Sequence, residues 1–357
     1  MFPFLGRANE VLMDSFVADT RNAQLSRKFK LYYRLRPFIP LLLRQLLQRK
    51  RNSGMEVPDA WYIPQDFIEQ FSDGIALDLA EFGDQTIIHP WPERKNFATV
   101  LTHDVETAQG FHKIDHLARM EESLGFRSSW HIVPHKYPVD VGLLKDLVDR
   151  GHEIGVHGYN HDGKLFTSKG IFDRRATKIN DALLEYGATG FRAPMVHRNL
   201  DWICELRIQH DASCFDIDPF QAMPGGVGSI WPFIVNDVVE LPYTLPQDHT
   251  LFVALGQESV DPWLEKLAFI RRWSGMALVL THPDYLDTQN RLDLYERFLD
   301  HLNMLDDHWR ALPAEVTRWW RHRSQSKIAQ DGSIAGPAAE AGWATSYRSL
   351  FGGNLPN

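Results

Sequence analysis

The sequence contains only two cysteines, Cys204 and Cys214, among 357 residues. Two cysteines do not make the disulfide framework of small secreted domains, so a reducing compartment is the simpler expectation. No apolar run reaches roughly 18 residues, which leaves no candidate for a membrane-spanning helix. Residues 1–10 lack the basic start, apolar core and small-residue cleavage site of a secretory signal. These absences predict a cytoplasmic protein.

The chain also has no excess of positive charge, since 38 Lys and Arg stand against 46 Asp and Glu, a net charge of −8. This balance gives no reason to expect nucleic acid as a partner. Residues 27–51 depart from it, with nine basic side chains and no acidic one. Such a segment is typical of a helix lying on an anionic membrane surface, here the inner face. It is equally typical of a helix packed on a barrel with its arginines in solvent.

Short apolar runs alternate with helical stretches between residues 97 and 321. Strands are expected at 97–101, 126–133, 152–157, 190–192, 238–241 and 276–281, and helices at 111–124, 141–150, 173–186 and 260–273. Repeated strand–helix alternation indicates parallel strands, for which a barrel is the natural closure. We therefore predict an α/β fold with a barrel over residues 96–321. A mainly helical or irregular extension precedes it over 1–95, and a small, polar, flexible tail follows over 322–357.

Two carboxylates lie where the first predicted strand ends. Asp104 and Glu106 are two residues apart, so on an extended backbone their side chains leave the same face. Ligands of parallel sheets bind beyond the carboxyl ends of the strands. A carboxylate pair at such an end favours a bound cation or a shared proton, although two solvated acids in a loop would look the same.

Three further polar residues or pairs follow predicted strands. His157 and His161 are four residues apart, so both imidazoles would share one face if the chain turns into a helix there. Together with one carboxylate they would provide three ligands and leave positions open for water and substrate, as in catalytic zinc sites. Arg192 could keep Asp104 ionised, or be a surface arginine. His282 could donate a proton to a leaving group, or cap its strand.

Four motifs in this order carry a resemblance to a known family. They are Thr102-His103-Asp104-Val105-Glu106, His157-Gly158-Tyr159-Asn160-His161, Arg192-Ala193-Pro194 and Leu280-Thr281-His282. Over residues 97–321 the chain resembles the polysaccharide deacetylases of carbohydrate esterase family four, with the nodulation-type chitooligosaccharide deacetylase domain as the subtype. The resemblance implies a distorted (β/α) barrel of about seven parallel strands. It also implies a divalent metal and removal of N- or O-acetyl groups from sugars.

The resemblance also implies roles for the acidic residues. Asp104 resembles the catalytic base. Many family members have a second aspartate where this chain has Val105. A subset has acid–Val–acid instead, with the third residue on the metal, so Glu106 resembles the ligand; whether Asp104 or Glu106 touches the ion stays open. An aspartate should also support the acid histidine, and Asp218 is favoured over the two alternatives Asp211 and Asp216.

The remaining matched positions complete the implied site. His157 and His161 resemble the metal-binding pair, Arg192 the arginine that orients the base, and His282 the catalytic acid. Zn²⁺ is the expected ion, with Co²⁺, Ni²⁺ or Mn²⁺ as alternatives.

The expected activity is removal of an acetyl group from an N-acetylated sugar of a glycan or glycan precursor, and the expected partner is this carbohydrate. One alternative is hydrolysis of a non-sugar C–N bond, such as a cyclic amide. A second is a non-haem iron oxygenase, because two histidines and a carboxylate also hold Fe(II). A third is an inactive glycan-binding barrel, although binding alone would not need Asp104, Arg192 and His282.

Overall fold

The computed structural model describes residues 59–63, 65–218, 220–221 and 226–351, together with seven single residues between 31 and 50. Most of the basic segment 27–51 therefore lies outside the described residues. Within the described part of the chain, no helix combines the length and the apolar character needed to cross a bilayer.

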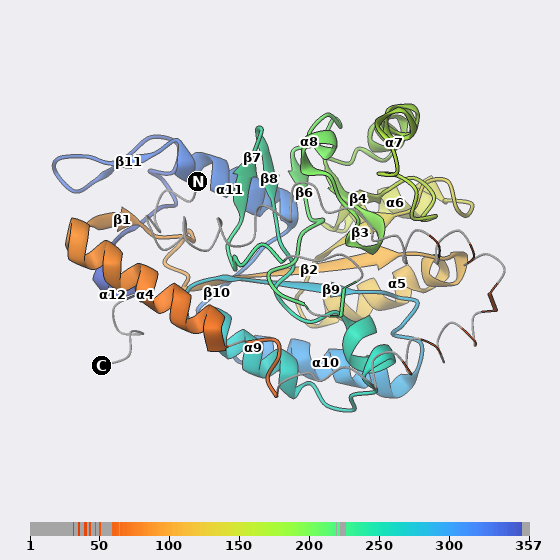
Figure 1. The fold of residues 1–357 in the computed structure, drawn as a ribbon, viewed down its shortest axis with the longest axis horizontal. Helices are drawn as coiled ribbons and strands as arrows, with labels where there is room; N and C mark the ends of the chain where they lie inside the picture. The colour runs from red at the N-terminus through yellow and green to blue at the C-terminus, as the bar shows by residue number, and fades with distance from the viewer. Residues whose placement is uncertain are drawn as a thin grey trace.

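A nine-stranded sheet forms the centre of the chain (Figure 1). In it, β7 (Phe233–Val235) runs antiparallel to β8, whereas β10 (His308–Arg310) pairs in parallel with the start of β2. The other seven strands run parallel. They are β2 (Phe97–Val105), β3 (Ser128–Ile132), β4 (Glu153–His157), β5 (Gly190–Arg192), β6 (His210–Asp211), β8 (Val238–Glu240) and β9 (Met276–Thr281).

Hydrogen bonds to β9 close this sheet into a barrel. β9 pairs along β2, and the chain that follows β8 reaches β9 from the other side. The backbone N–H groups of Thr244 and Leu245 donate to the carbonyl of Leu278, at 3.2 and 3.3 Å. The Thr244 hydroxyl also donates to the carbonyl of Met276, at 2.6 Å. The predicted α/β fold with a distorted barrel of about seven parallel strands is confirmed.

Helices connect the strands on the outside of the barrel. They are α5 (Ala108–Ser123), α6 (Val141–Asp149), α7 (Lys169–Tyr186), α8 (Leu200–Ile203), α9 (Asp261–Arg272), α10 (Gln289–Asn303) and α11 (Pro313–Ser324), with the short helices η2 (Pro194–Val196) and η3 (His249–Ala254). The side chains of Thr107 and Ser168 accept hydrogen bonds from the first-turn N–H groups of α5 and α7. The predicted starts of these two helices, at residues 111 and 173, are several residues too late. Apolar periodicity does not mark a helix start, which here is fixed by the capping side chain.

The core lies between the sheet and these helices. All nine residues of β2 are buried, as expected for a strand covered on both faces. Five tryptophans fill the core with fully buried side chains, namely Trp91, Trp130, Trp231, Trp263 and Trp273.

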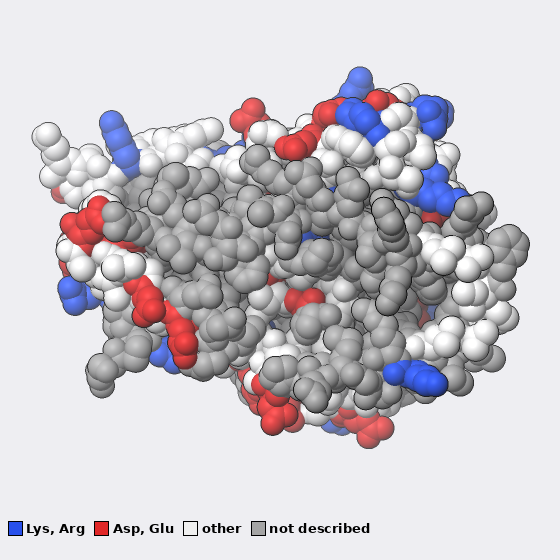
Figure 2. Space-filling view, in the orientation of Figure 1, with Lys and Arg blue, Asp and Glu red and all other residues white. Residues whose placement is uncertain are grey.

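Residues 65–88 and residues 327–351 pack together beside the barrel (Figure 1). They form α4 (Gln65–Phe82), β1 (Thr86–Ile88), β11 (Lys327–Ile328), β12 (Ile334–Ala335), β13 (Ala344–Ser346) and α12 (Tyr347–Phe351). β1 pairs with β13, and the Tyr347 hydroxyl donates to Asp78 of α4 at 2.7 Å. The prediction of a flexible tail is therefore wrong for residues 322–351, because distant segments supply its hydrogen-bond partners. Acidic side chains line α4 on the face shown in Figure 2.

Candidate functional site

The predicted site residues meet because their strands end at one side of the barrel. β2 continues to Val105, beyond its predicted end at residue 101, so Asp104 is still in the strand and Glu106 follows it. The sheet register places His157 of β4 directly beside Arg192 of β5. β2 pairs with β3 along one edge and with β9 along the other, and β9 ends one residue before His282.

Glu106, His157 and His161 form a candidate metal site. One ligand atom from each lies within 4.8 Å of the others. His157 donates from Nδ1 to the carbonyl of Arg192 at 3.1 Å, while its buried Nε2 has no hydrogen-bond partner among the described residues. Nε2 of His161 lies 2.9 Å from Oε1 of Glu106. Two imidazole nitrogens and a carboxylate oxygen are donors that suit a divalent ion such as zinc. The Nδ1–H bond to a carbonyl is the usual outer contact of a metal-binding histidine.

His161 reaches this site through a tight turn. The chain does not turn into a helix after His157. Bends occupy residues 159–163, and both Gly158 and His161 have positive φ angles, 64° and 58°. A Cβ atom at Gly158 would lie 2.4 Å from Cδ of Pro194. Glycine therefore permits both the turn and the close packing of the third motif against the second.

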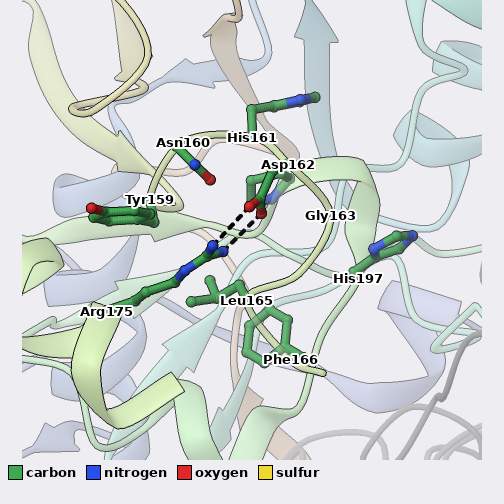
Figure 3. A pocket seen from close by; sticks show the side chains of 10 residues that line it. Tyr159, Asn160, His161, Asp162, Gly163, Leu165, Phe166, Arg175 and His197 are labelled. Atoms are coloured by element: carbon green, nitrogen blue, oxygen red, sulfur yellow. Dashed lines mark hydrogen bonds and ion pairs between the residues drawn. The ribbon is translucent and has the colours of Figure 1, made fainter. Parts of the chain in front are cut away.

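The His161 turn is held from its other side by α7 (Figure 3). Arg175 donates two parallel hydrogen bonds of 2.7 Å to the carboxylate of Asp162, the residue after His161. A pocket lies beside this turn, with Leu165 and Phe166 among its apolar lining residues. The paired bonds fix the planar guanidinium and hence the chain next to the candidate ligand.

Asp104 lies beside the candidate metal site and is held by Arg192. Nη1 of Arg192 donates to Oδ1 of Asp104 at 3.0 Å, and Nη2 donates to the hydroxyl of Thr102 at 3.0 Å. Oδ2 of Asp104 lies 3.5 Å from Nε2 of His157. Burial favours the protonated acid, but His157 and Arg192 outweigh it and hold the pKa of Asp104 below its ordinary value. The carboxyl is therefore ionised at neutral pH.

His282 lies on the other side of the candidate ligands and is held by Asp248. Its Nδ1 donates to Oδ1 of Asp248 at 2.7 Å, and its backbone N–H donates to Oδ2 at 2.8 Å. Nε2 of His282 lies 3.9 Å from Oε1 of Glu106. Burial opposes the charge of His282, but Asp248 and then Glu106 raise its pKa to about 9. His282 is therefore an imidazolium at neutral pH.

Asp218 is not the acid that supports His282, so that prediction is wrong. Asp218 accepts two hydrogen bonds within its own loop, from Phe220 at 2.9 Å and from Gln221 at 2.7 Å. The other two candidate aspartates bond elsewhere. Asp248 was missed because it follows an irregular segment after β8. No strand-end pattern marks it, because it lies well beyond β8, whose last residue is Glu240.

No protein-family model and no curated protein sequence matches this chain. Solved structures do match it. A provisionally assigned polysaccharide deacetylase from Mycobacterium smegmatis aligns with a TM-score of 0.57 and 18% identity, over 67% of this chain and 94% of its own. A probable polysaccharide deacetylase from Pseudomonas aeruginosa PAO1 aligns with a TM-score of 0.53 and 14% identity, over 68% and 97%.

An allantoinase, Puue, also aligns, with a TM-score of 0.50 and 15% identity over 68% of this chain and 96% of its own. At such identities, structural similarity establishes the fold and leaves the activity to be argued from the site. The resemblance expected from the four motifs is confirmed at the level of the fold, and this chain has the fold of the polysaccharide deacetylases.

Proposed function

We propose that this protein is a metal-dependent hydrolase that removes the acetyl group from an N-acetylated sugar of a glycan or glycan precursor. One observation carries the proposal. The candidate ligands Glu106, His157 and His161 are flanked by an ionised carboxylate, Asp104, and by a protonated imidazole, His282. An acid and a base in opposite protonation states are what amide hydrolysis at neutral pH requires.

In this proposal, Glu106, His157 and His161 hold one divalent ion and leave positions open for water and substrate. Zn²⁺ suits this donor set, and Co²⁺, Ni²⁺ and Mn²⁺ are alternatives. When bound, such an ion supplies Lewis acidity that polarises the acetyl carbonyl and lowers the pKa of the attacking water.

The flanking residues move the protons. Asp104 accepts a proton from the attacking water while the water oxygen bonds to the acetyl carbon. His282 gives its Nε2 proton to the sugar nitrogen as the C–N bond breaks, so the products are acetate and a free amine. Arg192 keeps Asp104 ionised and oriented, and Asp248 keeps His282 protonated with Nε2 directed toward Glu106.

Elemental analysis combined with an acetate assay tests this proposal. We expect close to one equivalent of divalent metal, together with acetate release from N-acetylated oligosaccharides, and the loss of both in His157→Ala/His161→Ala. The matched control is His112→Ala/His116→Ala, an exposed pair with the same spacing on α5, which should behave as wild type. A folded protein that holds no metal and releases no acetate with added zinc, cobalt or nickel would overturn the proposal.

Hydrolysis of a cyclic amide is the second candidate, because the same fold occurs in an allantoinase. Product analysis separates the two activities. Free acetate from an N-acetylated oligosaccharide supports deacetylation, whereas a ring-opened product from a cyclic amide supports the alternative. A requirement for O₂ would indicate an iron oxygenase instead.

We also propose that residues 27–51 bring a cytoplasmic enzyme to the inner face of the membrane, where a lipid-linked sugar precursor would be its substrate. The nine basic residues of this segment complement anionic lipids. Its described leucines, Leu31, Leu35, Leu43 and Leu47, are between 47% and 58% exposed. Sedimentation with membrane fractions before and after deletion of residues 1–55 tests this location. Unchanged partitioning would rule it out.

A further inference from the structure

The carboxylate of Asp284 joins the loop after β9 to the chain at Glu106. Oδ2 of Asp284 accepts the backbone N–H of Glu106 at 3.2 Å. The hydroxyl of Thr107 donates to Oδ1 of Asp284 and also caps the first turn of α5. One half-buried side chain thus holds the main chain of a candidate ligand and the helix that begins beside it.

The same loop approaches the side chain of Glu106. The hydroxyl of Tyr285 lies 3.4 Å from Oε2 of Glu106, and the backbone N–H of Tyr285 donates to the carbonyl of His282 at 2.9 Å. Lys113 of α5 donates to the carbonyl of Pro283 at 3.2 Å. The loop that carries the proposed acid therefore also positions the proposed carboxylate ligand.

Gly110 in α5 gives independent support for the importance of this contact. A Cβ atom at Gly110 would lie 2.3 Å from Oδ2 of Asp284. Gly110 lies within a regular helix, where glycine is less favourable than alanine. Its φ is not among the positive values, so the backbone itself does not require glycine. The space that a side chain would occupy is taken by the Asp284 carboxylate.

We propose that Asp284 is a positioning residue for the metal site, acting through Glu106. By fixing the main chain at Glu106, it keeps this carboxylate in place beside His161, where the two groups are 2.9 Å apart. Ligands held by outer hydrogen bonds bind metals more tightly, because they are already oriented before the ion arrives. The inference rests on the proposed function, since it needs Glu106 to be a ligand.

Zinc affinity tests the inference without any substrate. The dissociation constant for Zn²⁺ is measured by competition with a chromogenic chelator. Asp284→Ala should weaken zinc binding by about 10- to 100-fold. Asp284→Asn, which keeps one oxygen to accept the N–H of Glu106, should weaken it less.

Gly110→Ala provides a second test, because it leaves Asp284 in the chain and displaces its carboxylate. It should weaken zinc binding in the wild type, yet cause no further loss when added to Asp284→Ala. The matched control is Gly170→Ala in the first turn of α7. There a Cβ atom would meet only Arg174, at 3.8 Å, so zinc binding should be unchanged.

The outcomes separate this inference from the proposed function. Asp284→Ala and Gly110→Ala could both bind zinc within about twofold of wild type, while Asp284→Ala lowers the Tm of the metal-free protein. Asp284 would then be only structural, and the inference would be overturned. A wild-type protein that binds no zinc overturns the metal site and the inference together. A wild-type protein that binds zinc but releases no acetate overturns the proposed function alone. If Asp284→Ala does not fold, Asp284→Asn and Gly110→Ala decide the matter.

Discussion

Replacing Asp248 with asparagine tests how His282 is kept protonated. The Asp248 carboxylate accepts both the Nδ1–H and the backbone N–H of His282, at 2.7 and 2.8 Å. Against the opposing effect of burial, Asp248 and then Glu106 raise the pKa of His282 from 6.5 to about 9. Asparagine has nearly the size of aspartate but carries no charge, and His282 stays buried in the variant. The pKa of His282 should therefore fall to its ordinary value or below.

The size of the effect follows from the fraction of His282 that is protonated. A general acid must carry its proton, so the alkaline limb of the kcat/KM profile reports its pKa. With a pKa of about 9, roughly nine-tenths of the imidazole is protonated at pH 8; with a pKa of about 6.5, the fraction is about 3%. Asp248→Asn should therefore lose about 30-fold in kcat/KM at pH 8 and much less near pH 5.5.

The assay is acetate release between about pH 5.5 and 9.5. A bound cation opposes protonation of His282 in both proteins, so the difference between the two profiles is the relevant quantity. Asp300→Asn, an exposed position on α10, is the matched control and should keep the wild-type profile. A loss that is equal at every pH would refute the reasoning, because Asp248 would then orient the imidazole without raising its pKa.

Three further predictions follow from single contacts. Arg192→Lys loses the two-pronged contact of the guanidinium, so steady-state kinetics should show kcat reduced by at least about tenfold with KM nearly unchanged; a change in KM alone would argue against an orienting role. Gly158→Ala would bring a Cβ within 2.4 Å of Pro194 at a φ of 64°, and denaturant unfolding should show a loss of about 1–3 kcal/mol. Tyr347→Phe removes a buried hydrogen bond to Asp78, at a cost of about 1 kcal/mol, and unchanged stability would contradict the docking of the C-terminal segment.

The barrel and the order of its motifs could be predicted because both depend on local pattern. The boundaries of β5 and β9 match the predicted strands at 190–192 and 276–281, and β9 is a clear apolar run between polar loops. Residues after parallel strands must meet at one side of a barrel, so their proximity follows from the topology. The topology therefore explains why Glu106 lies close to His157 and His161.

Other features depend on contacts that no local pattern encodes. Asp248 precedes His282 by 34 positions and reaches it only because residues 244–245 hydrogen-bond to β9. The polar segment after α11 looked mobile by composition, yet β13 pairs with β1, far away in the sequence. The path to His161 depends on two positive φ angles, one at a non-glycine residue, and periodicity does not reveal these.

We propose that this site removes acetyl groups from sugars when it holds a metal ion. The most direct measurement is acetate release from an N-acetylated oligosaccharide by metal-free protein titrated with Zn²⁺. We expect acetate release to rise with zinc and to reach a plateau near one equivalent, and we expect Glu106→Gln to be inactive at the same zinc concentration. A protein that binds one equivalent of zinc and releases no acetate at any occupancy would contradict it.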